Sequence, residues 1–504
     1  MYKRLSVVLP VVMVGLVSLA CSLLSPAATP VLPPTPTRVV TTLLPSPAPA
    51  TSTPAAAPDA TATTPPNPSP QAPTETPTPA GLNATGPYVI FGGAGGVWVS
   101  NPDGTFLTQL SDLESQGDLH SAIAPRGDRL ALVVRTEDEL DLVIVQVPSG
   151  ETEMTIRLIP LTVDEEIADP VSAAAFALYA MRDYSSVAWQ PGDGRWLAFV
   201  GAMNGPTADL YLYDTQTQAI TQLTDGPSQA ILPEWSPDGQ YVLHAGVSWV
   251  PPFGGAILGA NQLDGVWAVR AADGEVIELP KPAGVHLNFV GWRDAGHYWT
   301  FDSNDECFAQ DLRAVDIASG VPVPGPGYSF YYAVAQAPGT GVLLIAGAAG
   351  CPSALGEGVF VLRPGEGMPT RLLDQRAYEI RWLPESQVFL AYPEALVSAD
   401  GQTAYAPPVY EASYNPAVSR AGYQAWEVIE NQAGRVVVKA PGGDWQPIRD
   451  GFVSNMIWDP VDGQTLLIVG QDGAVYAATA PDFAPRLMGS VGSQGAQMVW
   501  APPP

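Results

Sequence analysis

The chain is poor in the residues that build catalytic and metal sites. Among its 504 residues there are 3 cysteines and 4 histidines, and 22 basic residues stand against 50 acidic ones, for a formal charge of -28. Three cysteines are too few for a disulfide framework, and their spacing fits no zinc site. The negative charge repels phosphate, which makes nucleic acid and anionic lipid poor partners and favours solubility at an exposed surface.

Local catalytic motifs are missing as well. The sequence contains no Gly-x-Ser-x-Gly elbow, no phosphate-binding glycine loop, no dinucleotide fingerprint and no His-Glu-x-x-His segment. The histidines lie apart from any obvious nucleophile, at positions 120, 244, 286 and 297. The chain is therefore expected not to be an enzyme. The alternative is a site assembled from acids on distant segments, which leaves no local motif.

The N-terminus has the layout of an export signal. Lys3 and Arg4 form a short basic region, and an almost wholly apolar run from residue 5 to residue 20 leads to Cys21. The run is shorter than the roughly 20 apolar residues that span a bilayer comfortably, and no basic cluster follows it. A permanent transmembrane helix is therefore disfavoured.

Residues 19–21, Leu-Ala-Cys, resemble a bacterial lipobox, although Ser18 stands where the motif prefers leucine. The resemblance implies that residues 1–20 are a lipoprotein signal peptide and that Cys21 becomes the lipidated mature N-terminus. A plain secretory signal with an incidental cysteine is the alternative. With lipidation, the chain is expected outside the cytoplasm of a bacterium, anchored to the membrane through its N-terminal lipid.

Proline, threonine, alanine and serine dominate the segment that follows, so residues 21–86 are predicted to be a disordered stalk behind the lipidated cysteine. Proline fixes φ and removes backbone donors, which favours polyproline II and coil over helix or sheet. At ~3.1 Å per residue, about sixty extended residues reach on the order of 190 Å. That length clears a membrane surface.

A repeat begins after Pro87, and it predicts an all-β domain over residues 87–504. Each unit has an apolar strand, an aromatic-x-Pro-x-Gly turn and further short strands separated by glycine turns, with a period of roughly 35 to 65 residues. The clearest copies open at Trp189 and Trp235, and the weakest stretch is 377–451. Four short strands repeated at this period are typical of a β-propeller, which stacks its sheets around an axis.

The Trp-Ser-Pro-Asp-Gly turn at 235–239 resembles the PD40, or TolB-like, branch of the WD40-like β-propellers. The resemblance covers only the body of the chain. Proteins of the TolB type carry an α/β domain ahead of the propeller, whereas here the Pro/Thr-rich stalk occupies that place. The resemblance therefore implies the fold but not the envelope partner.

The two ends of the repeat region predict how the ring closes. The first unit, at residue 88, lacks an opening strand, and the chain ends on an orphan strand around Trp500, so strand 496–502 should complete the first blade. Counting opening strands gives nine units. Because propellers typically have about 4 to 8 four-stranded blades, one unit in 377–451 is interpreted as false. This predicts eight blades, with seven as the alternative.

Two features of the loops remain open. Cys307 and Cys351 fall in comparable loops of adjacent units, which in an exported chain favours a disulfide over two free buried thiols. Beside Cys307, the side chains of Asp302, Asn304, Asp305 and Glu306 offer the oxygen ligands that Ca²⁺ takes. Their spacing does not match an EF-hand, so a solvated polar loop is the favoured interpretation, and no cofactor is expected.

Together these features predict a membrane-anchored lipoprotein that displays a monomeric β-propeller as a non-catalytic binding module. The recurring tryptophans are interpreted as packing between blades and the Asp-Gly pairs as turns. The expected partner is an envelope protein or a glycan. The alternative is an extracellular propeller enzyme of the lyase, glycosidase or lactonase type, with acids or Ca²⁺ at a channel mouth.

Overall fold

The structure is a computed structural model. It describes residues 42–43, 81–115, 118–135, 140–159, 173–183, 185–248, 263–279, 286–303, 310–323, 334–347, 355–393, 395–492 and 496–503. The predicted signal peptide, Cys21 and the predicted stalk up to residue 80, apart from 42–43, lie outside the described residues. The unit Val40–Pro504 is compact by itself.

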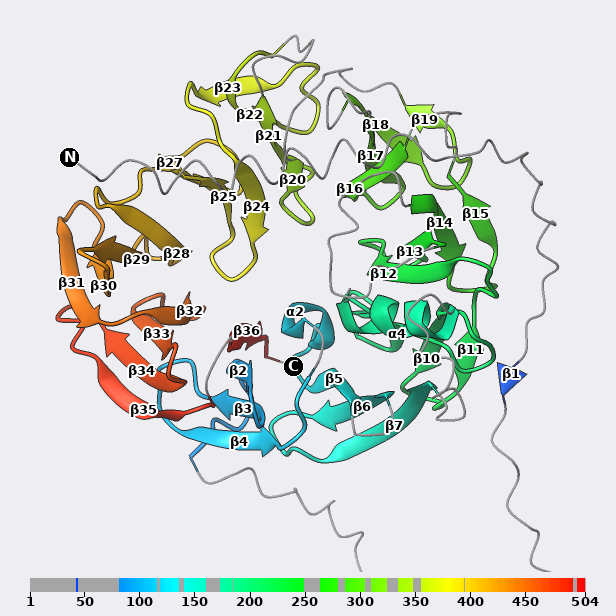
Figure 1. The fold of residues 1–504 in the computed structure, drawn as a ribbon, viewed down its shortest axis with the longest axis horizontal. Coiled ribbons are helices and arrows are strands. Elements are labelled where there is room, and N and C mark those ends of the chain that lie inside the picture. Colours follow the sequence, from blue (N-terminus) through cyan, green and yellow to red (C-terminus); the bar gives the residue numbers. More distant parts are fainter. Residues whose placement is uncertain are drawn as a thin grey trace, which may run out of the picture. The chain divides into compact units, whose positions relative to one another are not determined.

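The described strands form nine antiparallel sheets arranged around a centre, numbered here as blades 1 to 9 (Figure 1). From the innermost strand outward, blades 1 to 3 comprise β36 (Gln497–Ala501), β2 (Tyr88–Gly93), β3 (Gly96–Ser100) and β4 (Leu107–Ser111); β5 (Arg129–Arg135), β6 (Leu140–Gln146) and β7 (Thr152–Ile159); and β8 (Val187–Trp189), β9 (Trp196–Gly201), β10 (Asp209–Asp214) and β11 (Ile220–Gln222). The two-residue strand β1 (Thr42–Leu43) pairs with the outer edge of β11.

Blades 4 to 6 comprise β12 (Gln229–Trp235), β13 (Tyr241–Val247), β14 (Leu263–Arg270) and β15 (Val276–Glu278); β16 (His286–Asp294), β17 (His297–Ser303), β18 (Gln310–Asp316) and β19 (Pro322–Val323); and β20 (Val334–Gln336), β21 (Leu343–Gly347), β22 (Gly358–Leu362) and β23 (Thr370–Leu373). Blades 7 to 9 comprise β24 (Glu379–Leu383), β25 (Val388–Tyr392), β26 (Ala395–Ser398) and β27 (Ala404–Tyr405); β28 (Ala412–Val418), β29 (Gln424–Glu430), β30 (Ala433–Lys439) and β31 (Trp445–Asp450); and β32 (Val453–Trp458), β33 (Thr465–Gly470), β34 (Ala474–Thr479) and β35 (Arg486–Ser490). The described helices are α2 (Leu119–Ala122) and α4 (Ala173–Asp183).

Apolar side chains fill every interface around the ring. Separate buried clusters join blades 1 and 2, 4 and 5, 5 and 6, 6 and 7, 7 and 8, 8 and 9, and 9 and 1, and one larger cluster joins blades 2, 3 and 4. Each sheet therefore buries both faces against its neighbours, which a single sheet cannot do alone. The β-propeller fold that the sequence predicts is confirmed.

The predicted blade number is wrong: the described residues form nine blades, neither eight nor seven. No unit in the stretch 377–451 is false, since that stretch contains all of blades 7 and 8. These blades lack the Trp-x-Pro-x-Gly turn, but the central residues of their second strands are buried, as at Phe389 and Trp426. Burial on two faces needs only apolar strands, and the turn motif is dispensable.

The C-terminal strand closes the ring as predicted. β36 pairs antiparallel with β2, with Tyr88 opposite Ala501 and Gly92 opposite Gln497. The first turn of blade 2 rests on the same end of the chain, because a Cβ on Gly127 would lie 2.0 Å from the carbonyl oxygen of Pro502. Gly127 also has a φ of +62°, a conformation that favours glycine.

Blade 2 departs from the repeat, with three strands where four are expected. Its innermost position is taken by α2, which contacts β36, β5 and β8, and by a single bridge between Ile123 and Leu130. Asp118 caps this helix by accepting the N–H of His120 at 3.3 Å. A strand at the inner edge directs its side chains at the neighbouring blades. A helix in the same place also directs side chains into the ring interior.

The recurring tryptophans lie between blades, where three of them also donate hydrogen bonds to backbone carbonyls. The indole N–H of Trp189 donates to the carbonyl of Ala122 at 2.8 Å, and that of Trp235 donates to Ala188 at 2.8 Å. In blade 9, Trp458 donates to Ala417 at 3.2 Å. Each bond joins one innermost segment to that of the preceding blade, so these side chains belong to the framework rather than to a ligand site.

Candidate functional site

The antiparallel blades define two faces. The innermost strand of each blade begins on the face that carries the connections between blades, here called the crossover face. It ends on the opposite face, here called the turn face, which carries the turn after the first strand and the turn after the third. Tyr378, Tyr414 and Phe452 lie on the crossover face, whereas Phe106, in the turn between β3 and β4, lies on the turn face.

The ring interior is crossed by an ion pair. The Nδ1 of His120, in α2 of blade 2, lies 3.0 Å from the Oε1 of Glu385, in the turn between β24 and β25 of blade 7. Blades 2 and 7 are four steps apart by the shorter way around a ring of nine, so the contact joins almost opposite sides. Figure 1 shows α2 inside the ring and the β24 turn directed toward it.

The charge on this pair depends on pH. Burial disfavours the charged imidazolium, but the hydrogen bond to Glu385 and the charges of Glu385 and Asp118 outweigh it, so the pKa of His120 is raised above its ordinary value. The contact involves the Nδ1 of His120 and ties α2 of blade 2 to the β24–β25 turn of blade 7 across the ring interior.

Aromatic side chains gather at the crossover end of blades 7 and 8. Tyr392, at the end of β25, stacks on Tyr414, near the start of β28, with ring centroids 6.3 Å apart and planes at 21°. The backbone of Tyr378 lies beside them, because its N–H donates to the carbonyl of Tyr392 at 2.8 Å. As whole residues, Tyr378 is 60% exposed and Tyr414 41% exposed. These three residues are called the tyrosine rim below.

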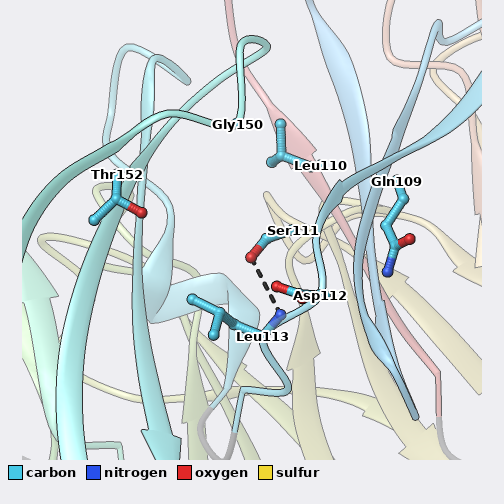
Figure 2. A pocket seen from close by; sticks show the side chains of 7 residues that line it. All are labelled: Gln109, Leu110, Ser111, Asp112, Leu113, Gly150 and Thr152. Atoms are coloured by element: carbon cyan, nitrogen blue, oxygen red, sulfur yellow. Dashed lines mark hydrogen bonds between the residues drawn. The ribbon is translucent and has the colours of Figure 1, made fainter.

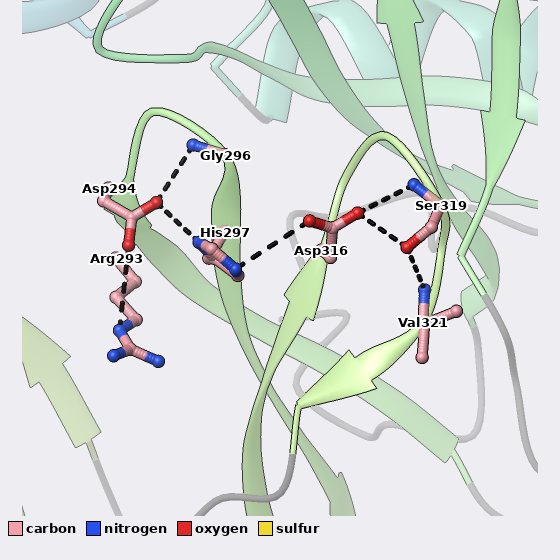
Figure 3. A network of polar contacts seen from close by, with 7 residues as sticks. All are labelled: Arg293, Asp294, Gly296, His297, Asp316, Ser319 and Val321. Carbon is pink, nitrogen blue, oxygen red and sulfur yellow. Dashed lines mark hydrogen bonds and ion pairs between the residues drawn. The ribbon is translucent and has the colours of Figure 1, made fainter.

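An Asp-His-Asp arrangement on the turn face of blade 5 has the composition of a catalytic group (Figure 3). His297 lies between Asp294, at 2.8 Å from its Nδ1, and Asp316, at 3.9 Å from its Nε2. The neighbouring hydroxyl of Ser319, however, donates to Asp316 at 2.6 Å and not to the imidazole. A nucleophilic serine needs its proton directed at the base.

The partners of the two carboxylates explain the arrangement. Asp294 accepts the N–H of Gly296 at 3.0 Å, and Asp316 accepts the N–H of Ser319 at 2.8 Å. The hydrogen bond from His297 and that from Gly296 outweigh burial and lower the pKa of Asp294, while those from Ser319 lower the pKa of Asp316. The group therefore stabilises the two turns on which it sits.

A pocket of about 440 Å³ lies on the outer rim, between β4 of blade 1 and the turn before β7 of blade 2 (Figure 2). It is lined by Gln109, Leu110, Ser111, Asp112, Leu113, Gly150 and Thr152. The hydroxyl of Ser111 accepts the backbone N–H of Leu113 at 3.2 Å. One carboxylate and no neighbouring acid, histidine or cysteine line it, so the pocket offers no acid–base pair.

Buried carboxyl groups elsewhere hold crossovers in place. Asp209 in β10 accepts the N–H of Gly226 at 2.8 Å, and burial raises its pKa to about 6. Glu427 in β29 accepts the N–H of Val453 at 3.0 Å and an amide N–H of Asn415 at 2.7 Å, and burial raises its pKa as well. Both bond to the chain as it enters the next blade, which is a structural role.

The candidate disulfide and metal loop remain predictions. Cys307, Cys351, Asn304, Asp305 and Glu306 lie outside the described residues, as does the side chain of Asp302. Within the described part of the chain, no group of three or more histidine, cysteine, aspartate or glutamate side chains is placed to hold a metal ion. Nor does any described helix combine the length and apolarity that crossing a membrane requires.

Comparison with known proteins adds a short sequence match and several fold likenesses. No family model matches the chain. A segment of 55 residues is 44% identical to the uncharacterized peptidase YuxL of Bacillus subtilis (strain 168), covering 11% of this chain and 8% of that protein. Because the match spans so little of the relative's length, it transfers no activity.

Among solved structures, dipeptidyl peptidase 4 of Porphyromonas gingivalis gives a TM-score of 0.43 at 10% identity, over 75% of this chain and 60% of that one. An oligogalacturonate lyase of Vibrio parahaemolyticus gives 0.33 at 12% identity, over 59% and 75%. TolB of Acinetobacter baumannii gives 0.28 at 12% identity, over 74% and 82%. At these scores the likenesses carry no argument about a site.

Sequence reasoning missed both the tyrosine rim and the contact across the ring. The rim residues are separated by 14 and 22 positions, from 378 to 392 and from 392 to 414, and share no motif. They also fall in the stretch that matched the repeat least. Only the placement of blades 7 and 8 side by side brings them together.

Proposed function

We propose that the chain is an exported lipoprotein that displays its propeller as a non-catalytic binding module, anchored through Cys21 and spaced from the membrane by residues 21–86. The fold alone does not define a function, so the proposal rests on how the two ends of the ring are used. The observation that carries it is the tyrosine rim, an exposed aromatic group on the crossover face in which Tyr392 stacks on Tyr414.

The exposed aromatics on one face support the same proposal. Large exposed aromatic side chains gathered in one place mark contact surfaces more often than they serve stability. Here they gather beside the axis on the crossover face, where Tyr378 and Tyr414 are both exposed. An enzyme of the lyase, glycosidase or lactonase type has less support, because the Asp-His-Asp group of blade 5 is committed to its turns.

The anchor is tested by expressing the full chain in a bacterial host and fractionating the cells. The wild type should partition with membranes and incorporate labelled palmitate, whereas Cys21→Ser should do neither. Cys351→Ser is the matched control, since it removes a thiol and leaves the signal intact. Equal membrane partition of wild type and Cys21→Ser would contradict the lipid anchor.

Binding is tested by presenting the purified full chain to envelope extract and to immobilised glycans, with hydrolase and lyase assays on the same glycans in parallel. Retention without turnover is the expected result. Release of sugar or peptide products at a constant rate would contradict the non-catalytic proposal, and retention of neither class would contradict binding.

A further inference from the structure

The tyrosine rim joins rings from two blades into one platform. Tyr392 is the last residue of β25 in blade 7, and Tyr414 lies near the start of β28 in blade 8. Their rings stack across the interface between the two blades. Burial raises the pKa of Tyr392, and the charge and hydrogen bond of the neighbouring Tyr414 raise it further, so the two phenol hydroxyls lie within reach of each other. Two phenol hydroxyls therefore lie beside an aromatic surface at the end of the ring.

Charged side chains of both signs flank the platform. Glu379 lies directly opposite Tyr392 in the β24–β25 ladder and forms an ion pair with Arg381 at 3.2 Å. The guanidinium of Arg376 lies 5.3 Å from the centre of the Tyr378 ring. The surface consequently combines flat apolar faces with one carboxylate acceptor and two guanidinium donors.

A sugar ring matches this combination. One face of a pyranose presents C–H groups that pack on an aromatic ring, while its equatorial hydroxyls accept and donate hydrogen bonds in the same plane. Sites for small ligands pair aromatic surface with a few polar groups in this way. Anionic glycans are disfavoured because the whole chain carries a charge of -28. A neutral glycan meets no such repulsion.

We infer that the tyrosine rim is a glycan-binding site for a neutral saccharide chain, with Tyr378 and Tyr414 as stacking platforms and Glu379, Arg381 and Arg376 as hydrogen-bonding partners. The inference rests on the proposed binding function and names its ligand class. Because Tyr378 and Tyr414 are both exposed on a rim, several consecutive sugars can contact the surface, which favours an oligosaccharide over a monosaccharide.

The first test measures binding of the full chain to neutral oligomers of glucose, mannose and N-acetylglucosamine, by array and then by calorimetry. At least one oligomer should bind, with affinity rising with chain length. Tyr414→Ala and Tyr378→Ala should each weaken it about tenfold or more, and Tyr414→Trp should retain it. Phe106→Ala is the matched control: that ring is 57% exposed but lies on the turn face. Circular dichroism checks that each variant is folded.

A protein partner gives a different outcome. Val409, in the crossover between blades 7 and 8, is 98% exposed, and a protein surface docking here would bury it. Val409→Ser should therefore leave glycan binding unchanged. If wild type binds no neutral glycan but captures an envelope protein, and Val409→Ser weakens that capture, the glycan inference is overturned and the binding function stands. If wild type retains neither a glycan nor a protein, both the glycan inference and the proposed binding function are overturned.

Unchanged glycan affinity in both Tyr378→Ala and Tyr414→Ala would also overturn the inference, because binding would then occur elsewhere on the propeller. The tyrosine variants and Phe106→Ala must be compared at equal salt, since loss of binding in salt would indicate an ionic contact rather than stacking.

Discussion

The hydroxyl of Ser236 donates a 2.6 Å hydrogen bond to the Oδ1 of Asp238, inside the Trp-Ser-Pro-Asp-Gly turn of blade 4. The same hydroxyl accepts the backbone N–H groups of Gln240 and Tyr241, so one serine organises the whole turn. Blade 9 replaces this serine with Asp459, which accepts the N–H of Val461 at 2.7 Å and faces Asp462. A carboxyl group thus takes the place of a hydroxyl beside a second carboxylate.

The exchange makes blade 9 sensitive to pH. Burial and the neighbouring Asp462 raise the pKa of Asp459 from 3.8 to about 6. A raised carboxyl pKa means that the folded chain holds the proton more tightly than the unfolded chain does. The stabilisation is therefore complete below about pH 4 and is lost as pH rises through about 6, by up to about 3 kcal/mol. Asp459→Ser should remove this loss.

Asp459→Ser is expected to raise the free energy of unfolding at pH 7 by about 1–2 kcal/mol and to flatten its change between pH 4 and pH 7. Thermal unfolding of both chains over that range measures it. The reciprocal change, Ser236→Asp, should introduce the same pH dependence into blade 4. Parallel pH profiles for wild type and Asp459→Ser would show that Asp459 does not titrate in this range.

A second prediction concerns His120. Glu385→Gln keeps the size of the partner but removes its charge, so burial should dominate and the pKa of His120 should fall. Wild type gains stability below the ordinary histidine pKa and loses it as pH rises through the raised one, and Glu385→Gln should lack this gain. Because the His120 side chain is 39% exposed, the gain is expected to be under about 1 kcal/mol.

Proton NMR titration of the imidazole resonances measures the pKa of His120, with His120→Asn identifying the signal. Glu379→Gln is the matched control, because Glu379 begins the same strand, β24, but has Arg381 as its partner. An unchanged titration of His120 in Glu385→Gln would mean that the two side chains do not meet across the ring in solution.

The repeat itself could be predicted because it is local. The turn at Trp235 to Gly239 marks strand boundaries within a few consecutive residues. The role of the strand around Trp500 follows from counting strands, because the first unit lacks one strand and the last has one to spare. The blade number failed for a physical reason: blades 7 and 8 hold together through buried aliphatic and aromatic strands such as that of Trp426, without the turn motif. The count of nine repeat units was correct, although the innermost position of blade 2 is a helix and not a strand, and the typical range of propeller sizes wrongly argued against it.

The candidate sites could not be predicted because they are not local. His120 meets Glu385 only because a short helix replaces the innermost strand of blade 2. Tyr392 meets Tyr414 only because their blades are neighbours. Periodicity and spacing carry information about one strand at a time, whereas both contacts depend on how many blades separate two segments.

The tryptophans of blades 4 and 5 allow a third prediction about the framework. Trp235 donates to the carbonyl of Ala188, whereas the indole nitrogen of Trp292 has no hydrogen-bond partner among the described residues. Substitution by phenylalanine removes the indole N–H donor at both positions, together with a similar apolar area. Trp235→Phe should cost about 1 kcal/mol more than Trp292→Phe, measured by urea unfolding, because it also removes a hydrogen bond between blades. Equal losses would mean that the indole bond adds nothing beyond packing.

The closing strand allows the last prediction. Removing residues 497–504 exposes the inner edge of β2, which pairs with β36 through Val89 opposite Trp500 and Ile90 opposite Val499. It also opens the apolar clusters on both sides of blade 1, where Met498, Val499 and Ala501 are buried. At about 1.5–3 kcal/mol for a fully buried large apolar side chain, the loss of stability is on the order of 5 kcal/mol.

An unpaired edge strand is moreover a template for intermolecular pairing. The truncated chain should therefore unfold at a lower temperature and form oligomers on size-exclusion chromatography, whereas a chain lacking only residues 503–504 should behave as wild type. A truncated chain that remains monomeric with an unchanged Tm would mean that the ring closes through the side-chain clusters alone.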